Sequence, residues 1–254
     1  MKKSLFIVIL LLILVALFQP QKTHRIIFQP TPTPEPAETK EPSPRISLNG
    51  VEYAYAFIRE ATASSISLIP NFTEKRDAKT IRDVHACNAA LNAGFYDASG
   101  KPLGYFFTDK KTYGKQIQSA LVNGFFWANH DGVAVISTEL PHVPMRFALQ
   151  TGPILLFDGQ SMPLVIQHDE PARRMVAAKT RGNTYVFLTV YDENSVFGGP
   201  LLSDLPSAVE EISNQEEFRI ADAINLDGGS ASAFYNGDTN LSEFTPVGSL
   251  FCVK

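Results

Sequence analysis

The sequence IADAINLDGGSAS, residues 220–232, places one carboxylate at the end of an apolar run and follows it with residues too small to cover it. The run from Ile220 to Leu226 alternates roughly as a buried strand would. Glycines permit positive φ and close approach of a ligand to the backbone, and serine hydroxyls can donate hydrogen bonds to an anion. We interpret the segment as a site at a strand end, although an Asp-Gly-Gly turn between two strands is the alternative. The candidate site residues in it are Asn225, Asp227, Gly228, Gly229, Ser230 and Ser232.

The composition is that of an ordinary globular protein. The chain has 254 residues, of which 44% are hydrophobic and 19% charged, with a formal net charge of −4. Residues 1–28 contain no acid, so the remainder of the chain is more acidic than the total. Because nucleic-acid binding needs a basic face, nucleic acid is excluded as a partner.

The N-terminus predicts export. Lys2 and Lys3 precede an unbroken apolar run from Leu5 to Phe18. At about 14 residues the run is short for a membrane span of about 20 and typical of a secretory signal, but no small-x-small cleavage site follows Ala16. An uncleaved membrane anchor and a cleaved signal therefore both stay open. In either case the lysines keep the N-terminus inside, so the globular part faces the periplasm or the outside.

A proline-rich segment follows the apolar run. Residues 29–44 contain almost no apolar side chain and repeat proline, which predicts an extended spacer or a disordered leader. The predicted organisation is a signal peptide or anchor with its flank over 1–28, a linker over 29–44 and a single domain over 45–254.

The body of the chain predicts an α+β domain with one mixed, largely antiparallel sheet flanked by helices. Short runs rich in aromatic and β-branched residues alternate with hairpin-like turns. Residues 51–58 and 65–70 are expected to be paired strands. Residues 77–86 are expected to form a short helix with Ile81 and Val84 on one face, and a second helix is expected from Ser203 to about Phe218.

Several segments with a common polar, glycine and apolar character precede residues 220–232. They are Asn92-Ala93-Gly94-Phe95-Tyr96, Pro102-Leu103-Gly104, Asn123-Gly124-Phe125-Phe126, Gln150-Thr151-Gly152-Pro153 and Arg173-Arg174. As an ordered set with the Asp227 segment they resemble the phosphodiester glycosidase family, over roughly residues 84 to 235. The family often has three glycines and two adjacent serines where this chain has Gly228-Gly229-Ser230-Ala231-Ser232. The resemblance implies the same fold class, and Asp227 itself matches the family's pattern.

The resemblance implies a sugar joined through its anomeric carbon to a phosphodiester, whose cleavage expels a phosphate monoester. The transition state then needs a cation for the departing phosphate and a carboxylate near the positively charged carbon. We assign Arg174 to the role of the cation and Asp227 to the role of the carboxylate. Adjacent side chains on a strand face opposite ways, so only one of Arg173 and Arg174 points into a cleft, and the family match favours Arg174. A surface salt bridge is the alternative for either arginine.

Two amides at strand ends, Asn92 and Gln150, are candidates to bind sugar hydroxyls or to orient Asp227. Alternatively, Asn92 caps a turn and Gln150 ends a strand. Further substrate-binding candidates are Gly94, Thr151 and Gly152. Asp192 and Glu193 follow the strongest strand and are reserve carboxylates, or simply the start of a loop.

No cofactor and no metal are expected. His130, His142 and His168 lack the spacing that places two ligands on one face, and no glycine-rich nucleotide loop is present. Cys87 and Cys252 are the only cysteines and form either a disulfide or two buried thiols.

The predicted function is that of an exported hydrolase that cleaves a glycosidic bond to a phosphodiester, in an envelope glycan or a sugar-phosphate compound. Its expected partners are the carbohydrate substrate and the membrane. A non-catalytic envelope module that binds an anionic glycan is the alternative. A third hypothesis is metal-dependent cleavage of the P–O bond.

Overall fold

The computed structural model describes residues 43–60 and 62–254. The apolar run Leu5–Phe18 and most of the proline-rich segment lie outside the described residues. Within residues 43–60 and 62–254, no helix has the length and apolar character needed to cross a membrane.

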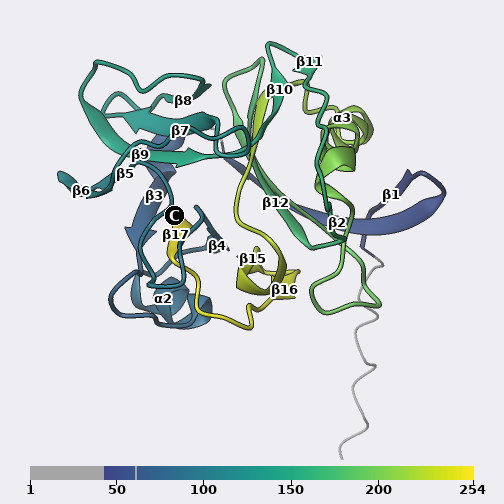
Figure 1. Cartoon of the computed structure of the whole chain (residues 1–254), viewed down its shortest axis with the longest axis horizontal. Helices are drawn as coiled ribbons and strands as arrows, with labels where there is room; N and C mark the ends of the chain where they lie inside the picture. The colour runs from purple at the N-terminus through teal and green to yellow at the C-terminus, as the bar shows by residue number, and fades with distance from the viewer. Residues whose placement is uncertain (1–42, 61) are drawn as a thin grey trace, which may run out of the picture. The chain divides into compact units, whose positions relative to one another are not determined.

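The described chain is built from three antiparallel sheets (Figure 1). The first has the order β1 (Arg45–Leu48), β2 (Val51–Glu60), β13 (Tyr185–Tyr191), β12 (Arg174–Thr180), β14 (Ile220–Asn225), β10 (Ile154–Phe157), β11 (Gln160–Ser161). The second has the order β16 (Asn240–Leu241), β15 (Phe234–Tyr235), β4 (Ala89–Asn92), β17 (Ser249–Val253), β3 (Ile66–Pro70). The third has the order β6 (Lys111–Gly114), β5 (Phe106–Thr108), β9 (Met145–Thr151), β7 (Gly124–Asn129), β8 (Ala134–Ser137).

One hydrophobic core joins the three sheets. Phe187 of β13, Phe251 of β17 and Phe126 of β7 each come from a different sheet, and their ring centroids lie 5.3 to 6.1 Å apart. Aromatic pairs at this spacing add stabilisation beyond the area that they bury. The three sheets therefore fold around a shared aromatic centre.

Two α-helices cover the sheets. Helix α3 (Leu205–Gln215) has Pro206 in its first turn and packs Val209 and Ile212 into a second core against the first sheet. Helix α2 (Ala78–Val84) begins at the N-cap Asp77, whose side chain accepts a hydrogen bond from the Thr80 N–H at 2.7 Å. Short 3-10 turns lie at Ala63–Ser65, Leu202–Asp204 and Gly229–Ala231.

The expected fold class needs three corrections. The described sheets have only antiparallel pairs and are three in number, so a single mixed sheet flanked by helices was wrong, although "largely antiparallel" was right. Strands β2 and β3 both form but belong to different sheets, because β2 pairs with β13 and β3 with β17. In α2, Ile81 is buried but Val84 is 62% exposed, since the helix ends at that residue.

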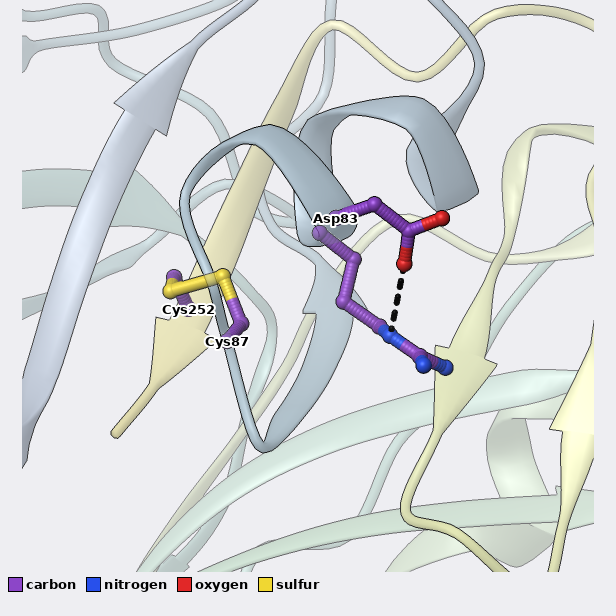
Figure 2. The surroundings of a disulfide bond; sticks show 4 residues. Asp83, Cys87 and Cys252 are labelled. Atoms are coloured by element: carbon purple, nitrogen blue, oxygen red, sulfur yellow. Dashed lines mark ion pairs between the residues drawn. A yellow bond between two sulfur atoms is a disulfide. The ribbon is translucent and has the colours of Figure 1, made fainter.

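The two cysteines form a disulfide (Figure 2). Cys87 follows α2 and Cys252 lies in β17, so the bond ties the last strand to the segment between α2 and β4. Of the two possibilities that the sequence left open, the structure has the bonded pair.

Candidate functional site

The candidate site lies where the chain leaves β14 and crosses from the first sheet to the second. Figure 1 shows this crossing as the yellow segment that runs from beside β10 and β12 down to β15. The Leu226 N–H still donates to the Met175 carbonyl at 2.8 Å, but the next N–H, that of Asp227, donates to the Ala93 carbonyl at 3.0 Å. Asp227 is therefore the residue at which the chain changes sheets.

Asn92 fixes this crossing from the end of β4. Its side chain is buried, with Nδ2 donating to the Asp227 carbonyl at 2.7 Å and Oδ1 accepting from the Ala233 N–H at 2.9 Å. The Asn92 amide is thus bonded to the main chain before Gly228 and Gly229, at Asp227, and after them, at Ala233. Of the two functional roles expected for Asn92, the geometry supports the orientation of Asp227.

The Asp227 side chain is half-buried and accepts few hydrogen bonds. Oδ1 accepts one bond, from the Gly228 N–H at 2.9 Å. Burial raises the pKa of Asp227 to about 7, and the bond from Gly228 opposes this rise only in part. A carboxyl with a pKa near neutrality can take up a proton and release it again during one reaction, which suits general acid–base chemistry.

The two glycines let the chain turn against the start of β12. A Cβ on Gly228 would lie 2.6 Å from the Arg173 carbonyl oxygen, and Gly229 has φ of +60° with its N–H bonded to that same oxygen at 2.9 Å. A close approach of a ligand to this backbone was expected, whereas the close neighbour in the structure is the protein's own Arg173 carbonyl. The turn that follows Asp227 is therefore in contact with the main chain of Arg173.

The two arginines make different contacts. Arg173 is the one that faces the Asp227 segment: its Nε donates to Ser232 Oγ at 2.6 Å, and its Nη2 donates to the carbonyls of Ser232 and Ser242. Its guanidinium also lies 5.0 Å from the centre of the Phe197 ring. Met175 and Val176, two positions after Arg173 and Arg174, are both buried and apolar, so the strand pattern alone does not separate the two arginines.

The Arg174 side chain points to the opposite face, where it bonds to the segment at residues 169–170 and to Pro200. Its Nη2 lies 3.4 Å from an Asp169 oxygen, and its Nε donates to the Pro200 carbonyl at 3.0 Å. Asp169 in turn accepts from the N–H groups of Leu202 and Ser203. Arg174 is thus the arginine with the salt bridge, which the sequence left open as the alternative to a catalytic role. No pattern in the sequence pairs Asp169 with Arg174.

Gln150 is fully occupied by a loop and not by a ligand site. Its Oε1 accepts from the N–H groups of Tyr105 and Ile117, and its Nε2 donates to the carbonyls of Ile117 and Val122. All four hydrogen-bonding positions of the amide are used. Gln150 therefore holds residues 115–122 in place, and a direct contact with a sugar hydroxyl is not supported.

The neighbouring candidates Thr151, Gly152 and Asn225 bond to one another. Thr151 Oγ1 donates to the Asn225 carbonyl at 2.8 Å, and Asn225 Nδ2 donates to the Gly152 carbonyl at 2.9 Å. Asn225 Oδ1 is buried and has no partner in the described part of the chain. An orphaned acceptor two residues before Asp227 marks a place where a water or ligand donor would be favourable.

The remaining predicted site residues divide between packing and the site. Gly94 packs, because a Cβ there would lie 2.4 Å from Leu149 Cδ1. Ser232 is buried, and its Oγ donates to the Gly229 carbonyl at 2.5 Å. Ser230 is exposed, and its carbonyl accepts from the Phe244 N–H at 2.8 Å.

The reserve carboxylates Asp192 and Glu193 are engaged elsewhere. Asp192 Oδ1 accepts from the Asn194 N–H at 2.8 Å and so closes a turn, while Glu193 forms an ion pair with Arg45. They begin the loop after β13, the alternative that the sequence left open. Across residues 43–60 and 62–254, no group of three or more His, Cys, Asp or Glu side chains is placed to hold a metal ion.

Comparison with known proteins gives a family and a fold. The family model described as phosphodiester glycosidase matches residues 85–254. The catalytic domain of zebrafish N-acetylglucosamine-1-phosphodiester alpha-N-acetylglucosaminidase is similar, with a TM-score of 0.61 and 16% identity over 83% of this chain and 80% of that chain. A hypothetical protein from Synechocystis has a TM-score of 0.54 and 14% identity over 83% of this chain and 61% of that chain. No curated protein sequence matches the chain.

Proposed function

The chain belongs to the phosphodiester glycosidase family, and from this we propose that it hydrolyses the bond between the anomeric carbon of a sugar and a phosphodiester oxygen. The substrate class is an envelope glycan or a sugar-phosphate compound. Asp227 and Arg173 are the two residues to which we assign the chemistry.

The observation that carries this proposal is a buried cation, without a direct ion pair, that is hydrogen-bonded to the segment that follows Asp227. Arg173 is 2% exposed, and among the described residues no Asp or Glu oxygen lies within 4.0 Å of its guanidinium. Its Nη1 has no hydrogen bond within the described chain, whereas Nε and Nη2 are used. Burial lowers the pKa of Arg173, and the charge of Glu243 opposes this only in part. A buried charge without a direct ion pair is costly, and an anionic ligand would relieve that cost.

In the reaction, the bond between the anomeric carbon and the phosphate oxygen breaks and water supplies the new hydroxyl on carbon. Arg173 holds the departing phosphate monoester, which is a good leaving group because its charge is already accommodated. The Asp227 carboxylate stabilises the positive charge at carbon, accepts the proton of the attacking water and passes it on to the phosphate product. A pKa of about 7 suits both halves of that transfer.

The test is hydrolysis by the full chain of a panel of glycosyl phosphodiesters in water labelled with oxygen-18. Label at the anomeric hydroxyl supports glycosidic cleavage. Label in the phosphate would contradict it and favour cleavage at phosphorus. Binding of the panel without turnover would favour the alternative, a module that holds an anionic glycan.

We also propose that the domain works outside the cytoplasm, at the periplasmic face of the inner membrane or beyond. The N-terminal order of two lysines, an apolar run and a proline-rich linker supports this. The Cys87–Cys252 disulfide supports it further, since such bonds persist in oxidising compartments. A reporter that is active only in the cytoplasm, fused after Lys254, should be inactive, and strong activity would contradict export.

A further inference from the structure

A half-buried phenylalanine, Phe197, and an exposed one, Phe244, pack together near Arg173. Phe244 is 79% exposed and its ring stands edge-on to Phe197, with the ring centroids 6.4 Å apart. Val196, next to Phe197 in the chain, is 77% exposed. We call Val196, Phe197 and Phe244 the apolar lip. A contiguous exposed apolar surface can mark a ligand-binding site.

The apolar lip is fastened to the candidate site by the main chain. The N–H groups of Phe244 and Thr245 both donate to the Ser230 carbonyl, at 2.8 and 3.2 Å. On the other side, the Arg173 N–H donates to the Phe197 carbonyl at 2.7 Å. The exposed ring of Phe244 and the half-buried ring of Phe197 are therefore placed by the same segments that place the guanidinium and the glycines.

The order of groups along the site assigns the lip to one end of the substrate. The Arg173 carbonyl touches the Gly228–Gly229 turn next to Asp227, whereas its guanidinium reaches away to Ser232, Ser242 and Phe197. If the sugar lies at Asp227 and the phosphate at the guanidinium, the lip meets the group on the far side of the phosphate. That group, the aglycone, is released together with the phosphate.

We propose that the apolar lip binds an apolar aglycone, so that the substrate is an amphiphile with a sugar, a phosphate and an alkyl or isoprenyl chain. This inference rests on the proposed function and deepens it. A buried cation flanked by exposed apolar side chains complements an anionic head joined to an apolar chain. Phe244 also lines a hollow of about 250 Å³ with Lys79 and Glu243, and a polar aglycone bound there would give the opposite preference.

The test compares two substrates that share one sugar 1-phosphate and differ only in the aglycone, octyl or glyceryl. For the wild type we expect kcat/KM to be roughly 10-fold higher for the octyl diester, as burial of a few methylenes predicts. Phe244→Ser should abolish this preference and leave the glyceryl diester within about twofold. Phe244→Leu should restore it, because an apolar side chain returns to the lip.

Phe157→Ser is the matched control, because Phe157 is 42% exposed at the end of β10 and outside the lip. It should keep the octyl preference, and all variants should melt like the wild type. Equal kcat/KM for the two diesters in the wild type, or a glyceryl preference, would overturn the apolar aglycone while leaving the glycosidase intact. If the wild type hydrolyses neither diester nor any other glycosyl phosphodiester, the proposed function fails and this inference fails with it.

Discussion

At the scale of single residues, Asp227 is a carboxyl kept where its charge is costly. Its folded pKa of about 7 lies above the ordinary value of 3.8, so the folded state binds the proton more tightly. The stability that the protonated group contributes is full below pH 4 and is lost as the pH rises through 7. Above pH 7 the loss amounts to about 4 kcal/mol at most. The ionised Asp227 carboxylate thus lowers the stability of the fold, a trade-off between stability and activity that is common at active sites.

Asp227→Asn should therefore stabilise the protein at pH 8 and have little effect at pH 4. The amide keeps the shape and the acceptor for the Gly228 N–H but carries no charge to desolvate. Melting temperatures of the variant and the wild type at both pH values measure this. A difference that is the same at pH 4 and pH 8 would mean that the Asp227 pKa is not raised.

The same carboxyl predicts the pH dependence of the rate. The proposed role needs the ionised form, so kcat should rise with pH through an apparent pKa of about 7 and level off above it. Asp227→Asn should lower kcat by about 100-fold or more at pH 8. Arg173, whose pKa burial lowers to about 10, stays charged over this range and adds no second limb below pH 9. A rate that falls between pH 5 and 8 would remove Asp227 from this role.

The neighbouring arginines provide a matched pair of variants. Arg173→Lys should lower kcat/KM by about 100-fold, because a point charge on a flexible stem cannot reproduce the fixed guanidinium fork. Arg174→Lys should leave kcat/KM within a few-fold and lower the free energy of unfolding by about 1–2 kcal/mol, through weaker bonds to Asp169 and Pro200. Steady-state kinetics and denaturant unfolding of both variants decide between them. The reverse pattern would return Arg174 to the site.

At the scale of elements, Gln150 of β9 is the support of a whole loop. Gln150→Leu removes its bonds to the main chain of Tyr105, Ile117 and Val122. We expect amide hydrogen exchange to become at least about 10-fold faster over residues 115–122 and to stay unchanged in the first sheet, since local opening costs less than global unfolding. Thr108→Val, which removes one bond to Leu68 from the neighbouring β5, is the control. Unchanged exchange at Ile117 would show that the loop holds itself.

Individual strands were predictable from the sequence because their pattern is local, whereas their partners were not. β2 and β3 form close to the expected ranges 51–58 and 65–70, since β-branched and aromatic runs bounded by turns leave few other choices. The pairing of β2 with β13 joins segments more than 100 residues apart in the chain, and no local pattern encodes such a contact. A single mixed sheet was predicted because the sequence does not show which distant strands pair.

The candidate site was predictable to the same degree. Asp227 followed from one segment, where a carboxylate, two glycines and a strand end are adjacent. The choice between Arg173 and Arg174 required their side-chain contacts, because Met175 and Val176, the residues two positions on, are both buried. The sequence around Phe244 does not indicate a role for it, because it is a lone aromatic residue in a polar loop. Its place near the site follows only from the hydrogen bond of its main-chain N–H to the Ser230 carbonyl.

At the scale of the whole molecule, the second sheet is closed by the last strand of the chain. β17 lies between β3 and β4, and it carries Phe251 into the shared core and Cys252 to the disulfide. Asp227 depends on this sheet, because its N–H is bonded to Ala93 at the end of β4. The geometry of the site thus rests on the correct docking of the C-terminus.

The disulfide should therefore stabilise the domain and influence the site only through folding. Replacing Cys87 and Cys252 together by Ser should lower the free energy of unfolding by about 2–4 kcal/mol, since the bond closes a loop of 165 residues and restricts the unfolded chain. At a temperature well below the lowered melting point, kcat should stay within about twofold of the wild type, because neither sulfur touches Asp227 or Arg173. Chemical denaturation and kinetics of the double variant test both halves. A normal unfolding free energy with lost activity would mean that the bond shapes the site directly and not through the docking of β17.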